Sequence, residues 1–193
     1  MIHWGINALN HGSSLAVFDK WRHIETVASD KIKIDQSVIQ QQIADRGMPD
    51  RIFWYERPWL KKARQVYAGQ YDTALRLDNL PSHYLKEIGL GHVPVTYTPH
   101  HASHAAAGYY TSPFNNAAVV VLDAIGEFEC ASIWHCVHGE MRKVWSKSYP
   151  HSLGLFYSAF TKLLGMTPIR DEYILQQMAA QGDPDRYRDR KSV

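Results

Sequence analysis

Three of the eleven histidines of this chain fall within five residues, at His100, His101 and His104. The pair Thr98-Pro99 before them is typical of a helix start, because threonine caps a first turn and proline fits the first helical position. On such a helix His100 and His104 lie four residues apart, so their imidazoles project from one face. Two neutral imidazoles at this spacing can bind a divalent metal. The pair predicts a metal site that other residues must complete.

A carboxylate further along the chain is a candidate to complete that site. Asp123 ends an apolar run, residues 117–123, that we expect to form a buried central strand. A buried carboxylate needs a partner, and imidazole together with carboxylate suits iron or zinc. We therefore predict that His100, His104 and Asp123 bind a divalent metal, with iron or zinc favoured, and that His101 lies at the surface. A solvent-exposed pair of histidines near the helix cap is the alternative.

The elements that must position these residues repeat one theme along the chain. We expect strands at residues 2–8, 15–18 and 24–32 before a helix at 37–46, and strands at 117–123, 130–137 and 141–146 before an amphipathic helix that Ser152 caps and Gly165 ends. Between the two sets, a strand at 51–55 and a region of helix and loop at 58–91 lead to a strand at 93–96 and to the histidine helix, which is expected to end at Tyr110. Each set has a small-residue turn after its first strand, where backbone N–H groups can bind phosphate. This repeat resembles the actin-like ATPases, although hairpins with glycine turns are also common as purely structural elements.

Composition excludes several classes of function. The 193 residues are 45% hydrophobic, which is enough for a real core, and the formal net charge of +2 without a basic stripe gives no support for a nucleic-acid partner. No apolar run approaches the length of a membrane span, and no secretory leader is recognisable, so we expect a cytoplasmic protein with no membrane partner. Cys130 and Cys136 are predicted to be free thiols in the core.

Taken together, the motifs resemble the carbamoyltransferases that act on nodulation factors and on antibiotics such as tobramycin and cephamycin. The resemblance rests on GINA at residues 5–8 with the following HGSS turn, PHHASHAA at 99–106, LDAIGE at 122–127 and PHSLGLFYSAFT at 150–161. These segments span most of the chain in the family's order. The resemblance implies an α/β, actin-like ATPase (ribonuclease H-like) fold with a mixed sheet flanked by helices, similar to the metal- and nucleotide-binding domain of the threonylcarbamoyl-adenosine tRNA enzymes.

The resemblance also implies a reaction. In such proteins a separate domain makes carbamoyl-adenylate from carbamoyl phosphate and ATP, and the actin-like domain passes the carbamoyl group to a hydroxyl of a small-molecule acceptor. A metal would act as a Lewis acid on a phosphate or carbamoyl oxygen. A histidine or carboxylate nearby could take the proton of the acceptor hydroxyl. The identity of the acceptor does not follow from the fold.

Individual positions carry over onto this sequence. His100 and His104 match the metal-binding histidines of the family, and Asp123 matches the carboxylate beside metal and nucleotide, with a catalytic role. Two turns of this sequence match the family's two phosphate-facing hairpins. The first carries His11, a catalytic candidate, together with Ser13 and Ser14, and the second carries Gly126 and Glu127. Ser13, Ser14, Gly126 and Glu127 are the candidates for binding ATP or carbamoyl-adenylate. Glu127 could equally be a solvated turn residue. The sequence departs from the family at Gly12, where aspartate is usual, and at Ala124, where glycine is usual.

The length implies that parts of the family's architecture are absent. We expect residues 1–182 to form the N-terminal lobe and 183–193 a charged tail, without the second lobe and the adenylate-forming domain. A separate chain carrying the missing lobe is therefore an expected partner, and the surface of a lone lobe would also favour self-association. Two other functions stay open, in this order: a non-catalytic binding or scaffold relative, and a metal-dependent phosphohydrolase.

Overall fold

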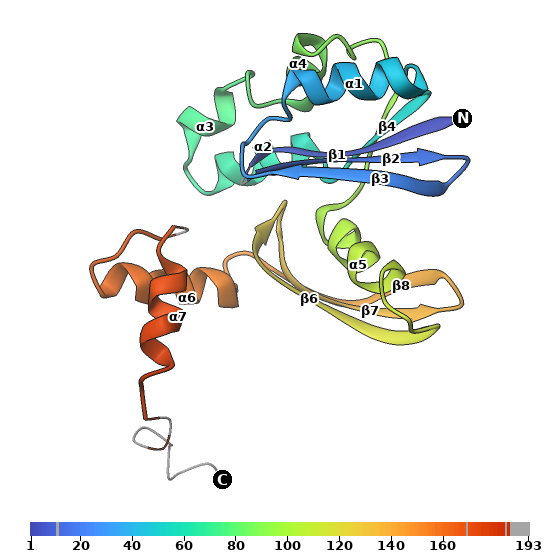
Figure 1. The fold of residues 1–193 in the computed structure, drawn as a ribbon. Helices are drawn as coiled ribbons and strands as arrows, with labels where there is room; N and C mark the ends of the chain where they lie inside the picture. Colours follow the sequence, from blue (N-terminus) through green and yellow to red (C-terminus); the bar gives the residue numbers. More distant parts are fainter. Residues whose placement is uncertain (11, 169, 184, 186–193) are drawn as a thin grey trace.

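The computed structural model describes residues 1–193 except 11, 169, 184 and 186–193 (Figure 1). The predicted residue His11 and most of the predicted tail therefore lie outside the described residues. In the described part of the chain the strands form two sheets, one mixed and one antiparallel, with helices packed on them. The predicted α/β fold, with a mixed sheet flanked by helices, is confirmed. Among the described residues, no helix has the length and apolar character needed to cross a membrane.

The mixed sheet has the strand order β3-β2-β1-β4-β5. Its strands are β1 (Ile2–Asn10), β2 (Gly12–Asp19), β3 (Arg22–Ser29), β4 (Arg51–Trp54) and β5 (Val95–Tyr97). Neighbours within β1 to β3 run antiparallel, whereas β4 runs parallel to β1 and β5 runs parallel to β4. Because parallel strands end at the same edge, the carboxyl ends of β1, β4 and β5 lie together.

Helices cover one face of this sheet. Between β3 and β5 the chain forms α1 (Gln36–Arg46), α2 (Pro58–Tyr67), α3 (Tyr71–Leu75) and α4 (Pro81–Glu87). Trp4, Ile6 and Leu15 of the sheet are buried in one cluster with Ile39 of α1 and Leu85 of α4. The opposite face is directed toward the second sheet (Figure 1). We call the mixed sheet with α1 to α4 the first unit.

The antiparallel sheet belongs to the second unit, which comprises the elements from α5 to α7. Its strands, in the order β6-β7-β8, are β6 (Asn116–Gly126), β7 (Glu129–Val137) and β8 (Glu140–Ser148). Helix α5 (His100–Tyr110) packs on the face that looks toward the first unit, and α6 (Leu153–Leu163) and α7 (Glu172–Ala179) follow β8 (Figure 1). The region predicted as a single lobe, residues 1–182, thus contains two sheet units, and its boundary stays a prediction.

The histidine helix begins one residue later than the sequence indicates. Its N-cap is Pro99 rather than Thr98, and no side chain caps it. Thr98 instead donates its backbone N–H to the carbonyl of Trp54, continuing the pairing of β5 with β4. The predicted cap at Thr98 is wrong because that residue is still held in an extended ladder. The predicted end at Tyr110 is confirmed.

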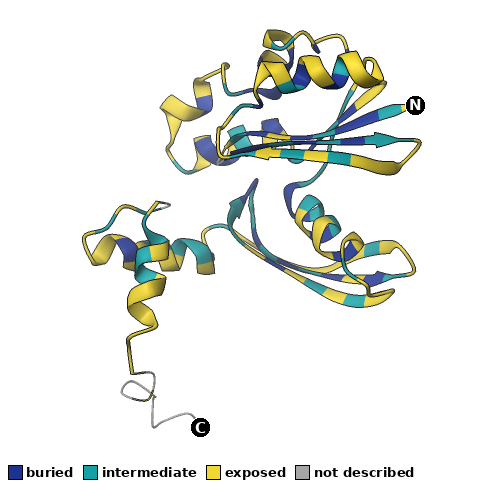
Figure 2. Ribbon diagram, in the orientation of Figure 1, coloured by how far each residue is buried: buried dark blue, intermediate teal, exposed yellow. Residues whose placement is uncertain are grey.

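Strand β6 is not the buried central strand that its apolar run predicts. It lies at an edge of its sheet, and its side chains alternate between a covered and an open face. Val120 and Leu122 on the open face are 60% and 61% exposed (Figure 2). Helix α5 covers only the other face, where Val121 is buried with Ala105 and Tyr109. The apolar side chains Leu153, Phe156 and Phe160 of α6 are exposed as well.

The start of α6 is fixed directly against the end of β6. The Ser152 hydroxyl accepts a hydrogen bond from the Leu155 N–H (3.0 Å), which confirms the predicted N-cap, and donates to the Ala124 carbonyl (2.6 Å). A Cβ added to Gly154 would lie 2.7 Å from the Cα of Ala124, so only glycine lets the helix approach this closely. The segment at 150–161 therefore holds the strand end that carries Asp123.

This close approach predicts that Gly154→Ala destabilises the protein. The added methyl must push α6 away from Ala124, and overpacking of this kind costs about 1–3 kcal/mol of the free energy of unfolding. Urea denaturation of the purified chain measures the change. The matched control is Gly108→Ala in α5, where the new Cβ would lie 3.8 Å from Val119 and alanine should stabilise the helix by up to about 1 kcal/mol. Equal free energies of unfolding for Gly154→Ala and Gly108→Ala would contradict the packing argument.

Candidate metal centre

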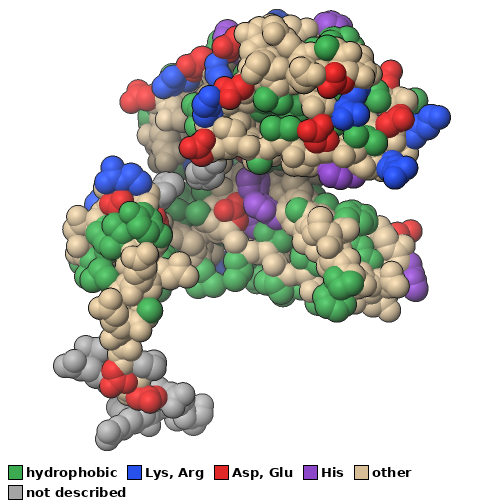
Figure 3. Space-filling view, in the orientation of Figure 1, with side chains coloured by type: hydrophobic (Ala, Val, Ile, Leu, Met, Phe, Trp, Pro, Cys, Tyr) green, Lys and Arg blue, Asp and Glu red, His purple; other side chains and the backbone are tan. Residues whose placement is uncertain are grey.

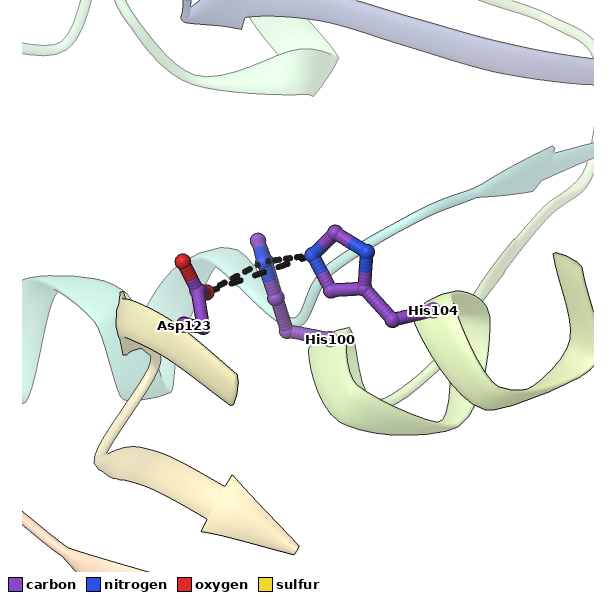
Figure 4. A group of neighbouring side chains, drawn as sticks. All are labelled: His100, His104 and Asp123. Carbon is purple, nitrogen blue, oxygen red and sulfur yellow. Dashed lines mark hydrogen bonds and ion pairs between the residues drawn. The ribbon is translucent and has the colours of Figure 1, made fainter. Parts of the chain in front are cut away.

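Three predicted metal ligands, remote in sequence, lie together in the structure. The two Nε2 atoms of His100 and His104 are 3.0 Å apart, and Asp123 Oδ2 lies 3.0 Å from His100 Nε2 and 4.0 Å from His104 Nε2 (Figure 4). Each residue thus directs one ligand atom toward the other two, all within 4.8 Å of one another. Histidine and acidic side chains are visible in the hollow between the two units (Figure 3). The juxtaposition agrees with the sequence, while metal binding itself stays a prediction.

Different elements position the three side chains. Helix α5 presents His100 and His104 one turn apart, and β6 brings Asp123 beside them where its pairing with β7 becomes irregular. His100 is buried, whereas the His104 side chain is 54% exposed. The Asp123 carboxylate is held by the Ala124 N–H, which donates to Oδ1 at 2.7 Å, so Oδ2 remains directed to the histidines. The side of the cluster formed by His100 is therefore buried, and the side formed by His104 is accessible to solvent.

Gly126, predicted to bind a cofactor, lies directly against this cluster. A Cβ at this position would lie 2.3 Å from His100 Cδ2 and 3.0 Å from Asp123 Oδ2. Real Cβ atoms essentially never approach this closely, so any other residue would displace the imidazole. The absence of a side chain at Gly126 is therefore a condition for the arrangement of His100 and Asp123. A contact of Gly126 with nucleotide stays a prediction.

The electrostatics of the cluster centre on His100. Burial lowers the pKa of His100, but its contacts with Asp123 and Glu56 outweigh burial and raise that pKa to about 9. Burial and the neighbouring His100 lower the pKa of His104. Burial raises the pKa of Asp123, yet the contact with His100 outweighs it and the net pKa is lowered. The two carboxylates thus favour the charged form of His100, and a metal ion bound at Nε2 would have to displace the proton there.

The donor set fits a divalent transition metal. Two imidazole nitrogens and one carboxylate oxygen suit iron or zinc. Two ligand atoms on a tetrahedral zinc ion, each about 2.0–2.1 Å from it, lie roughly 3.3 Å apart. The observed separations of 3.0, 3.0 and 4.0 Å bracket that value. Three protein ligands with an open side are typical of catalytic rather than structural sites.

One residue of the site, Glu56, was not predicted from the sequence. It lies two residues after the end of β4, is 6% exposed, and places Oε2 3.6 Å from His100 Nδ1. Burial raises the pKa of Glu56, but His100 and Lys61 outweigh burial and lower it. Its signal in the sequence is a carboxylate immediately after the hydrophobic run at residues 52–55, because binding sites form at the carboxyl ends of parallel strands.

The predicted hairpin serines lie on opposite faces of the mixed sheet. Ser14 pairs with Asn7 of β1, and its side chain lies on the face of β2 opposite to the buried Ser13 and Leu15. Ser13 is buried on the face that the helices cover, where its hydroxyl has no hydrogen-bond partner among the described residues. Their proposed contacts with nucleotide stay predictions, as does the catalytic role of His11, which lies outside the described residues.

Glu127 is not a solvated turn residue. It follows β6 with a φ of 58°, is buried, and places both carboxylate oxygens against the Arg57 guanidinium, with Nη2 to Oε2 at 2.5 Å. Its Oε1 also accepts the backbone N–H of Arg57 at 2.7 Å. The alternative of a solvent-exposed Glu127 is therefore wrong, and the carboxylate connects the second unit to α2. A role in binding cofactor stays a prediction.

His101 and the two cysteines all lie in the interior of the protein. The expected surface position of His101 is wrong: it is 1% exposed, and its Nδ1 lies 2.8 Å from the Ser132 hydroxyl. The histidine occupies the face of α5 that packs on β7, which the spacing of His100 and His104 leaves undetermined. Cys130 and Cys136 are buried free thiols, as predicted.

The contact at Gly126 generates a prediction for metal binding. Gly126→Ala should weaken the affinity of the purified chain for Co²⁺ by at least about tenfold, because the new methyl displaces His100 from Asp123. A titration followed by the visible absorption of bound Co²⁺ measures the affinity. Gly108→Ala serves as the control and should bind as the wild type does. Wild-type affinity in Gly126→Ala would show that His100 has room to move without leaving the site.

Comparison with known proteins places this geometry in a family. The family model described as "Carbamoyltransferase N-terminus" matches residues 51–190. An uncharacterized protein of Synechocystis sp. is 41% identical over 91 residues, which are 47% of this chain and 15% of that protein. Nodulation protein NolO of Bradyrhizobium diazoefficiens is 33% identical over 90 residues, which are 47% of this chain and 16% of that protein. The matched part of the chain thus spans only about a sixth of the length of these curated relatives.

The chain was also compared with solved structures. YeaZ from Pseudomonas aeruginosa superposes with a TM-score of 0.42 and 11% sequence identity, covering 77% of this chain and 67% of that chain. The family model carries the assignment, since its match includes α5 with both histidines, all of the antiparallel sheet and the helix that follows it. The chain belongs to the carbamoyltransferase family, whose N-terminal region it represents.

Proposed function

We propose that this chain provides the metal-binding part of an enzyme that transfers a carbamoyl group from carbamoyl-adenylate, made from carbamoyl phosphate and ATP, to a hydroxyl of a small-molecule acceptor. The observation that carries the proposal is the convergence of His100, His104 and Asp123 in a chain of the carbamoyltransferase family. The reaction would take place in the cytoplasm, where both substrates are made.

Each residue of the cluster has a distinct part in this proposal. His100, His104 and Asp123 would hold an iron or zinc ion, which supplies Lewis acidity toward a phosphate or carbamoyl oxygen when bound. His100 is fixed by burial and by two carboxylates, while the exposed side of His104 leaves room for substrate. Asp123 offsets the charge of the cation and serves as a catalytic carboxylate. His11 is the proposed second catalytic residue, through the family resemblance alone.

The nucleotide would bind between the two units. Ser14 lies on the face of β2 opposite to the buried Ser13, and Gly126 borders the histidines, so both positions support binding of ATP or carbamoyl-adenylate there. The side chains of Ser13 and Glu127 are buried. Their proposed contribution is therefore through backbone N–H groups of the two turns, which can bind phosphate oxygens.

A separate chain carrying the second lobe is the proposed partner. In the first unit β1 has strands on both sides, whereas within the described residues β6 has one only on the side of β7. The open face of β6, with Val120 and Leu122, and the exposed side of α6, with Phe156 and Phe160, would be covered by that lobe. Self-association through the same surface is the other outcome, and size-exclusion chromatography with light scattering of the chain alone distinguishes them.

Metal content tests the site directly. The chain, dialysed against Zn²⁺ and then against metal-free buffer, should retain close to one ion per chain, and His104→Ala should lose it because one of three ligands is gone. His83→Ala is the matched control, since His83 lies exposed on α4 of the first unit. Elemental analysis gives the ratio. Equal metal content in wild type and His104→Ala would remove the metal site and favour a non-catalytic scaffold.

Transfer activity tests the reaction. Labelled carbamoyl phosphate with ATP should yield labelled acceptor when the chain is mixed with the partner that carries the second lobe and the adenylate-forming domain. Asp123→Asn in the same mixture should lower the rate by at least about 10–100-fold, because a neutral amide would hold the Lewis-acidic cation less tightly than the carboxylate does. Release of phosphate from carbamoyl phosphate by the chain alone, abolished by Asp123→Asn, would instead identify a metal-dependent phosphohydrolase.

A further inference from the structure

The segment that leaves β4 makes three successive contacts with the second unit. The carbonyl of Tyr55 accepts a hydrogen bond from the Ser103 hydroxyl of α5 (2.9 Å). Glu56 faces His100, and Arg57 forms the ion pair with the buried Glu127. The candidate ligands His100, His104 and Asp123 belong to the second unit, whereas Glu56, which contacts His100, belongs to the first.

The carboxylate of Glu56 is held in one orientation. Its Oε1 accepts hydrogen bonds from Lys61 Nζ at 2.7 Å and from the Tyr55 hydroxyl at 3.1 Å. These two donors lie on the first unit and fix the carboxylate plane from one side. The other oxygen, Oε2, is thereby left to face His100 Nδ1 at 3.6 Å, and both residues are buried.

The two ring nitrogens of His100 have different surroundings. Nε2 faces Asp123 and His104, whereas Nδ1 is buried and has no hydrogen bond among the described residues. A neutral imidazole that binds a metal through Nε2 carries its remaining proton on Nδ1. In metal sites this N–H generally donates to a carboxylate or carbonyl, which fixes the tautomer and the ring orientation. Glu56 Oε2 is the carboxylate oxygen that faces Nδ1, and the two groups must approach by a few tenths of an ångström from 3.6 Å to form that hydrogen bond.

We propose that Glu56 is a positioning residue, which accepts the Nδ1–H of His100 and so sets the affinity of the cluster for its metal. The inference rests on the proposed metal site and deepens it. When a metal ion takes the place of the Nε2 proton, that proton is released to solvent, and the Nδ1 proton stays between His100 and Glu56. The carboxylate would also strengthen the electron-pair donation of Nε2 to the cation.

A competing explanation is that Glu56 serves only as the counter-charge of Lys61 and holds the two units together. Three variants separate the two roles. Glu56→Gln removes the charge while keeping the shape, and Glu56→Asp keeps the carboxylate on a shorter side chain. Ser103→Ala is the matched control, because it breaks another contact between the same segment and α5 without touching His100.

The experiment is a Co²⁺ titration of the purified chain and these variants, followed by the visible absorption of the bound ion, with far-ultraviolet circular dichroism to verify folding. We expect Glu56→Gln to raise the dissociation constant about 10–100-fold, Glu56→Asp to restore part of the affinity, and Ser103→Ala to bind as the wild type does. Should Glu56→Gln fail to fold, the comparison of Glu56→Asp with Ser103→Ala decides.

Two results would overturn the proposal alone. One is a Co²⁺ affinity of Glu56→Gln that lies within about twofold of the wild-type affinity, while His104→Ala still abolishes Co²⁺ binding. The other is an equal loss in Ser103→Ala, which would assign the effect to contact between the units. Absence of Co²⁺ binding in the wild-type chain would overturn both this inference and the proposed metal site.

Discussion

The imidazole of His100 lies between two carboxylates that come from different sheets, Asp123 of the second unit and Glu56 of the first. The two carboxylates stabilise the charged form of the buried His100, and His100 in turn stabilises both of them, with Lys61 also paired to Glu56. The position of α5 between the sheets follows from this arrangement, since moving the helix would leave buried charges unpaired. The ion pair of Arg57 with Glu127 repeats the same kind of bridge beside it.

Two glycines allow the backbone to come close enough for this arrangement. Gly126 leaves space for the His100 ring, and Gly154 lets α6 lie on Ala124. The end of β6 is therefore enclosed by a helix on each side, with Ser152 joined to the carbonyl of Ala124. The segment at 150–161 contributes by fixing the strand end that carries Asp123, whose carbonyl also accepts a hydrogen bond from the Ser152 hydroxyl at 3.2 Å.

The parts of the structure set by local sequence were predictable. The spacing of His100 and His104, the cap at Ser152 and the apolar run that ends at Asp123 all depend on residues close together in the chain. The open face of β6 was not predictable, because an apolar strand looks the same whether one or both faces are covered. Glu56 was missed for a related reason: its role depends on how the two units pack.

The contacts of residues 55–57 have a mechanical consequence. Because this short connection joins the first unit to His100 and to Glu127, a metal ion held at His100 would be coupled to the packing of the two units. By thermodynamic linkage, an ion that binds only the folded chain would stabilise it, and this packing with it. At a free metal concentration one hundred times the dissociation constant, that stabilisation amounts to about 2.7 kcal/mol. Such an ion would then stabilise the packing of the two units in addition to supplying Lewis acidity.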